Sequence, residues 1–171
     1  MIYIVIFIVL FLIEIFYFRI ADKFNIIDKP NERSSHSLVT LRGGGIIFYF
    51  AVLIFFCVSG FQYHWFFIGL TLLSGISFLD DIVNVSNKVR LLIHFASVLL
   101  FAYQLSLFDL SWYYLIVAFI LAVGVINAYN FMDGINGITA CYSLSVFSLL
   151  IFINTKIQFV NHDLLIYTTL S

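Results

Sequence analysis

Apolar stretches separated by short polar segments constrain the fold of this chain more than any other feature. They lie at residues 1–18, 45–61, 65–79, 91–106, 112–127, 138–153 and from 164 onward. A helix needs about 20 mostly apolar residues to cross a bilayer, and several of these stretches are somewhat shorter, which leaves their polar ends at headgroup depth. We therefore predict an all-α, polytopic transmembrane helix bundle with about six spans and part of a seventh.

The composition supports a membrane protein, because 63% of the residues are hydrophobic, 10% are charged and the mean hydropathy is +1.11. No linker or internal repeat is evident, so residues 1–171 are predicted to form a single integral membrane domain. Cys57 and Cys141 fall inside apolar stretches and indicate neither a disulfide nor a metal site. Glu14 is the one charge in the first stretch. We expect it to reach the interface or pair with Arg19, with a polar cavity as the alternative.

The basic residues indicate the orientation. Seven of the eight Lys and Arg residues lie in the polar segments after the first and third stretches. Because basic loops stay in the cytoplasm, we predict that the N-terminus lies outside and that residues 19–44, 80–90 and 128–137 form cytoplasmic loops. The protein is thus predicted to be a multi-pass protein of the plasma (inner) membrane with its functional loops in the cytoplasm.

The second cytoplasmic segment begins with two adjacent carboxylates, Asp80 and Asp81, at the end of an apolar stretch. They repel each other and lie at the negative end of a helix dipole, so a positive charge should compensate them. A hard cation such as Mg²⁺, bound through oxygen ligands, would do so better than the few nearby side chains, which include Lys88 and Arg90. We predict Asp80 and Asp81 as metal ligands, with a solvated turn as the alternative.

The first cytoplasmic segment leads into three glycines at 43–45. Glycines at a helix start let the backbone approach a ligand, and the free N–H groups there favour anions. Arg33, His36 and Arg42 precede the glycines and add donors, so we predict phosphate binding that includes Gly44. A flexible hinge entering the helix is the alternative.

The third segment concentrates polar groups between two apolar stretches. It contains three amides, a carboxylate and two glycines, and its polar members are Asn127, Asn130, Asp133 and Asn136. Such groups at membrane depth must line a wet cavity or be satisfied by a ligand. A simple turn would explain the glycines but not the other groups.

Three motifs in this order resemble those of the polyprenyl-phosphate N-acetylhexosamine-1-phosphate transferases. This family, of the glycosyltransferase family 4 type, includes phospho-N-acetylmuramoyl-pentapeptide transferase and the enzymes that initiate O-antigen and teichoic acid synthesis. The motifs are Asp-x-Pro-x-x-Arg-x-x-His from Asp28 with the following Gly-Gly, the Asp-Asp pair, and Asn-x-x-Asn-x-x-Asp-Gly-x-Asn-Gly from Asn127.

The resemblance implies transfer of a sugar-1-phosphate from a UDP-N-acetylhexosamine to undecaprenyl phosphate, with Mg²⁺ as cofactor. The product would initiate a lipid-linked cell-surface glycan such as O-antigen, capsule or another cell-wall polymer. Asp80, Asp81 and Asp133 would then be catalytic, and which of the first two binds metal and which the acceptor stays open. The implied substrate-binding residues are Asp28, Arg33, His36, Arg42, Gly44, Lys88, Asn127 and Asn130. No nucleic-acid partner is expected, and a homodimer is left open.

The chain departs from the family pattern in places. Val39 and Leu41 stand where family members often have prolines, and Asn136 replaces a frequent aspartate. The family's later aspartate motif and its histidine loop have no counterpart, so we expect an N-terminal fragment that inserts into a membrane without transferring sugar. The competing hypothesis is a multispan transporter or lipid-binding membrane protein, which would use Glu14 and the Asp-Asp pair as ion sites.

Overall fold

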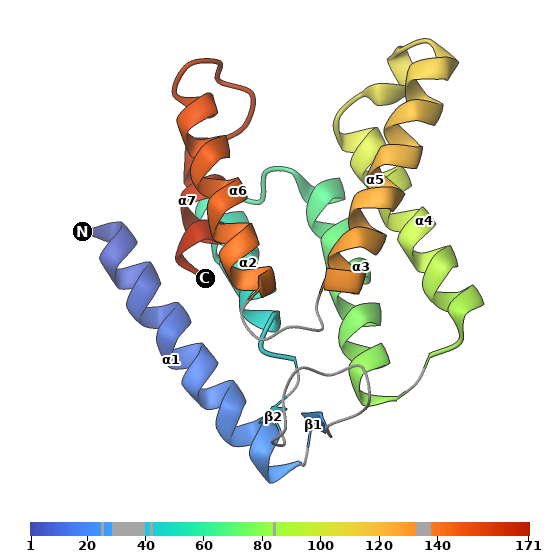
Figure 1. The fold of residues 1–171 in the computed structure, drawn as a ribbon. Coiled ribbons are helices and arrows are strands. Elements are labelled where there is room, and N and C mark those ends of the chain that lie inside the picture. The colour runs from blue at the N-terminus through green and yellow to red at the C-terminus, as the bar shows by residue number, and fades with distance from the viewer. Residues whose placement is uncertain (25, 29–39, 42, 84, 133–137) are drawn as a thin grey trace. The chain divides into compact units, whose positions relative to one another are not determined.

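The computed structural model of the chain describes all residues except 25, 29–39, 42, 84 and 133–137. The described part is helical apart from one pair of very short strands (Figure 1). The helices are α1 (Ile2–Lys23), α2 (Ile46–Val58), α3 (His64–Ile82), α4 (Asn87–Gln104), α5 (Trp112–Met132), α6 (Ile138–Asn154) and α7 (His162–Leu170), with a 3₁₀ turn, η1 (Leu107–Asp109). Each α-helix falls on one of the predicted apolar stretches, which confirms the all-α class.

Four helix ends extend into the predicted cytoplasmic loops, and one of them is the end of α3 at Ile82. In addition, helix α1 continues to Lys23, α4 begins at Asn87, and α5 continues to Met132. The predicted loops 19–44, 80–90 and 128–137 are therefore wrong at these ends. Hydropathy marks where apolar side chains stop, whereas the backbone hydrogen bonds of a helix continue through polar residues such as Lys and Arg, which are good helix formers.

The strands β1 (Ile27–Asp28) and β2 (Thr40–Leu41) were not predicted. They pair antiparallel, with Ile27 opposite Leu41 and Asp28 opposite Thr40. Two residues are too few to give a recognisable alternating pattern, so hydropathy could not indicate them. The pairing joins the two ends of the first predicted loop.

The chain forms two compact units, residues 1–57 with 132–171 and residues 58–131. In the first unit, α1, α2 and α7 share a core of buried apolar side chains: Ile6, Leu10, Ile47, Ala51, Phe55 and Tyr167. The Tyr167 ring makes edge-on contacts with Tyr3 and Phe55. The hydroxyl of Tyr3 donates to Asp163 Oδ1 at 2.9 Å and ties the start of α1 to the start of α7.

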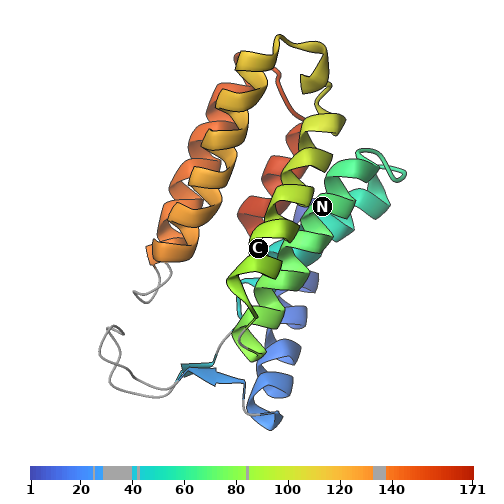
Figure 2. The same cartoon turned by 90° about the vertical axis from the view of Figure 1, so that its right-hand side faces the viewer.

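The second unit is built on an antiparallel pair, α3 and α4, which lie side by side in both views (Figures 1 and 2). Gly69 of α3 makes the close approach possible, because a Cβ there would lie 3.0 Å from the backbone oxygen of Ser97. At the end of the pair distant from Asp80, the Trp65 amide donates to Gln104 Oε1 at 3.1 Å. Helix α5 meets α4 through the Phe95 and Phe119 rings.

Two described helices are long and apolar enough to cross a membrane, α1 and the 112–129 part of α5. Helices α2 and α6 and the 64–80 part of α3 are apolar but shorter. Large apolar side chains are exposed along α1 and α5, as expected for helices that face lipid or further protein. The number of spans and their orientation stay predictions.

Candidate functional site

The Asp-Asp pair ends helix α3, as the sequence predicted. Asp80 and Asp81 lie in its last turn, and the amide of Val83 closes that turn by donating to the oxygen of Leu79 at 2.7 Å. Ser86, in an extended conformation, precedes α4. The side chain of Asp81 lies outside the described part, so the geometry below concerns Asp80.

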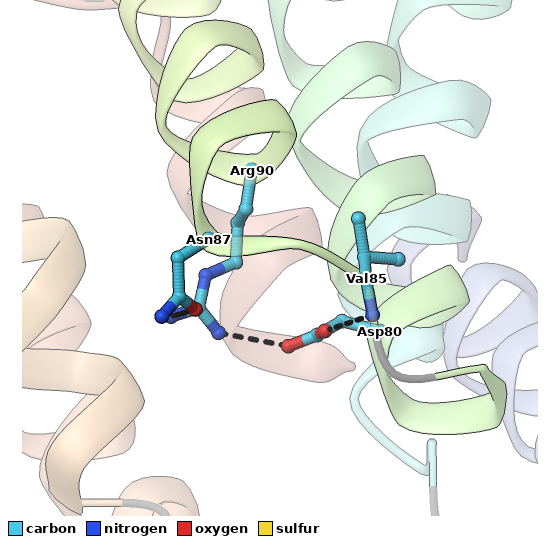
Figure 3. A network of polar contacts seen from close by, with 4 residues as sticks. All are labelled: Asp80, Val85, Asn87 and Arg90. Carbon is cyan, nitrogen blue, oxygen red and sulfur yellow. Dashed lines mark hydrogen bonds and ion pairs between the residues drawn. The ribbon is translucent and has the colours of Figure 1, made fainter.

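Each carboxylate oxygen of Asp80 accepts one hydrogen bond (Figure 3). Arg90 Nη1 donates to Oδ2 at 2.8 Å, and the Val85 amide donates to Oδ1 at 2.9 Å. Arg90 Nη2 in turn lies 3.4 Å from Asn87 Oδ1, a long contact that still orients the guanidinium. The side chains of Arg90 and Asp80 are 30% and 27% exposed, so this pair is reachable from solvent.

Arg90 supplies part of the positive charge that the sequence led us to expect from a metal ion. The sequence analysis named Arg90 but assigned it no role. The detectable signal was a carboxylate at one helix end with an arginine ten residues later, across a short turn. The sequence did not show which nearby cation would pair with Asp80, because the pairing depends on the residue at which α4 begins.

Lys88 and Arg90 are presented on different sides of α4. Residues two apart on a helix are separated by about 200° around its axis. Arg90 turns toward Asp80, whereas Lys88 is exposed and forms no ion pair with any described residue. Lys88 is therefore accessible to a ligand, and the phosphate contact predicted for it stays a prediction.

Gly44 lies against the carboxylate of Glu14. A Cβ on Gly44 would lie 3.3 Å from Glu14 Oε1 and 3.8 Å from the Phe18 ring, and Glu14 Oε2 is buried without a described partner. The expected pairing with Arg19 is wrong, since no ion pair joins the two described side chains. The turn before α2 thus faces an anion belonging to the chain itself, which does not favour a phosphate on that side of Gly44.

The other predicted site residues are described only in part. Asn127 is half-buried in α5, and Asn130 is three residues further along the same helix, so neither lies in a loop as predicted. The backbone of Asp28 belongs to β1. Asp133, Arg33, His36 and Arg42 lie outside the described residues. Gly44 and Asp28 belong to the first unit, and Asp80, Lys88, Asn127 and Asn130 to the second.

Two buried polar side chains that the sequence analysis missed lie on the Arg90 side of α4. His94 is 7% exposed and Ser97 is fully buried, and His94 Nε2 and Ser97 Oγ have no described partner. The spacing of positions 90, 94 and 97 places all three on one helix face, which could have indicated this polar line. The sequence analysis missed it because His94 and Ser97 lie within the apolar stretch 91–106.

No group of three or more His, Cys, Asp or Glu side chains is arranged to hold a metal ion within the described part of the chain. Mg²⁺ usually takes only one or two protein carboxylates, with water and substrate phosphates completing its shell. Each Asp80 oxygen accepts one hydrogen bond and retains a further lone pair, so Asp80 can still contribute to such a shell. Asp80 is thus the one described carboxylate of the pair with lone pairs left for Mg²⁺, and Mg²⁺ binding here stays a prediction.

Comparison with known proteins places these features in a family. The sequence profile described as glycosyl transferase family 4 matches residues 63–170. A protein of Bacillus subtilis (strain 168), named probable undecaprenyl-phosphate N-acetylglucosaminyl 1-phosphate transferase, is 25% identical over 142 residues. That match covers 74% of this chain and 40% of the relative, so the chain spans less than half the length of this relative. No solved structure matches.

Proposed function

Because the chain belongs to glycosyl transferase family 4, we propose that the full-length protein transfers a sugar-1-phosphate from a UDP-N-acetylhexosamine to undecaprenyl phosphate. The name of the Bacillus subtilis relative supports this donor and acceptor class. The product would be a lipid-linked sugar diphosphate that initiates a cell-surface glycan. The observation that carries the proposal is the turn between α3 and α4, where Asp80 is an oriented carboxylate and Lys88 is an exposed cation that forms no ion pair with any described residue.

The reaction joins two anions. An oxygen of the lipid phosphate attacks the phosphorus next to the sugar, the bond to the oxygen of UMP breaks, and UMP leaves with the electron pair. Such a reaction needs charge neutralisation and alignment more than covalent help from the protein. In the proposed arrangement the exposed apolar helices would lie in the bilayer, so that the lipid acceptor and the turn at the end of α3 would meet at the same membrane boundary.

The side chains of this chain supply charge and orientation. Lys88 would contact phosphate oxygens of the donor, and Asp80 or Asp81 would orient or deprotonate the lipid phosphate. Asn127, Asn130 and Asp133 would bind the nucleotide sugar. Mg²⁺, held by Asp81 and by the remaining lone pairs of Asp80, would neutralise the charge of the donor diphosphate.

We further propose a multi-pass arrangement in the plasma membrane with the turn between α3 and α4 in the cytoplasm. The distribution of basic residues supports it, because Lys88 and Arg90 flank this turn and Lys156 is the only basic residue in a predicted outer loop. A cytoplasmic turn gives the site access to UDP-sugars, which are made in that compartment.

The test is UMP release by the full-length protein in detergent with Mg²⁺, undecaprenyl phosphate and a panel of UDP-N-acetylhexosamines. Asp80→Asn and Asp81→Asn should each lower turnover by about 10³-fold, since electrostatic alignment provides most of phosphoryl-transfer catalysis. Asp109→Asn is the matched control, because Asp109 is exposed on η1 beyond the other end of α4. Ordinary turnover in both Asp-Asp variants would refute the roles assigned to them.

A further inference from the structure

We propose that Arg90 is a positioning residue that acts through Asp80 and has no contact of its own with substrate. This inference rests on the proposed function and concerns how the carboxylate is kept in one orientation. The proposal gives different roles to the two cations at the start of α4. Arg90 is committed to the protein, and Lys88 is left for the ligand.

The first argument is that both charges lie at unfavourable helix ends. Asp80 is in the last turn of α3, where the helix dipole disfavours an anion, and Arg90 is near the first turn of α4, where it disfavours a cation. Helix formation alone would favour the opposite arrangement. The ion pair at 2.8 Å offsets both penalties at once, so each residue is explained by the other and not by its own helix.

The second argument is that the pair removes the rotational freedom of the carboxylate. Donors from two different sources, the Arg90 guanidinium and the Val85 amide, bind one oxygen each. Rotation about the last side-chain bond would break both contacts. The remaining lone pairs of Asp80 then point in fixed directions, which is the preorganisation that phosphoryl transfer requires.

The third argument is the contrast between Arg90 and Lys88. Both are cations in the first four residues of α4, but the helix phase turns only Arg90 to Asp80. Asn87 adds a contact that orients Arg90, whereas no ion pair joins Lys88 to any described residue. Lys88 is thus a matched control within the same turn of the same helix.

The test is a double-mutant cycle in the full-length protein, with single-turnover transfer from a radiolabelled donor and with thermal unfolding in the same detergent. Arg90→Gln should lower the transfer rate about 10- to 100-fold, the usual effect of removing a residue that orients a functional side chain. The protein should stay folded at the assay temperature. Arg90→Lys should recover part of the rate, because an ammonium group reaches one oxygen without the fork.

The decisive result is the coupling between the two residues. If Arg90 acts through Asp80, the Asp80→Asn/Arg90→Gln double variant should be no slower than Asp80→Asn alone. The Lys88→Gln change should instead multiply with Asp80→Asn, because Lys88 acts independently. Multiplication of the Arg90 and Asp80 effects would overturn the positioning role. Absence of UMP release from the wild type with every donor would reject the proposed function itself and the role of Arg90 with it.

Discussion

Two glycines of helix α3 should respond to the same substitution with opposite signs. A Cβ on Gly69 would lie 2.7 Å from Cε1 of Phe101 and 3.0 Å from the backbone oxygen of Ser97. A Cβ on Gly75 would meet no described atom within 4 Å. Both positions are helical, so Gly→Ala improves the helix propensity at each by the same amount.

The magnitudes follow from these contacts. Gly→Ala in a helix interior stabilises by about 0.5–1 kcal/mol when nothing opposes it. At Gly69 the Phe101 ring could rotate, but the Ser97 oxygen is backbone, so α4 itself must move away. Overpacking of this kind costs about 1–3 kcal/mol. We expect Gly75→Ala to stabilise by roughly 0.5–1 kcal/mol and Gly69→Ala to destabilise by up to about 2 kcal/mol.

Thermal unfolding of the two variants in one detergent measures the difference between them. Because the propensity gain is common to both, this difference of about 1–3 kcal/mol isolates the contact between α3 and α4. Equal stability of Gly69→Ala and Gly75→Ala would refute the close approach of the two helices at Ser97. Displacement of α4 should also weaken transfer, since α4 carries Arg90.

Three further results are expected. Ser97→Ala should stabilise the protein by about 1 kcal/mol in thermal unfolding, because it removes a buried hydroxyl without a described partner; a loss of stability would reveal a partner. Asn154→Ala should destabilise by about 2–4 kcal/mol, because the buried amide accepts from the Phe159 and Val160 backbone and donates to the Val160 oxygen. The exposed Gln158→Ala control should change little, and an equally small effect at both positions would show that these three hydrogen bonds do not stabilise the loop before α7. The orientation can be tested in a variant that lacks both native cysteines. In intact cells, Ser86→Cys should resist an impermeant thiol reagent, whereas Gln158→Cys should react. Labelling of Ser86→Cys from outside would overturn the predicted orientation.

Sequence could predict where helices exist because a long apolar stretch has no alternative in a membrane to satisfying its own backbone hydrogen bonds. It could not place their ends. Lys88 and Arg90 interrupt the hydropathy of the chain, but the α4 backbone already forms its hydrogen bonds around them. The same reason extends α5 past Asn127, so an amide cluster that resembled a loop is partly helical.

The candidate site was predictable in its residues and less so in its contacts. The Asp-Asp pair at a helix end and a compensating cation follow from charge and the helix dipole. Charge alone does not tell whether Lys88 or Arg90 pairs with Asp80, because that depends on which side of α4 faces the end of α3. A shift of α4 by two residues would reverse which cation meets Asp80.

The glycines before α2 show that a helix start predicted to bind a ligand anion can instead face an acidic side chain of the same protein. Free N–H groups at a helix start attract anions, and for that reason Gly44 was predicted to contact a phosphate. In the structure the carboxylate of Glu14 lies on that side, and a Cβ on Gly44 would approach its Oε1 to 3.3 Å, a tight contact. The carboxylate form of Glu14 would repel a phosphate placed on this side of Gly44. The donor phosphates should therefore find their positive partner in Lys88, an exposed cation at the start of α4 that forms no ion pair with any described residue.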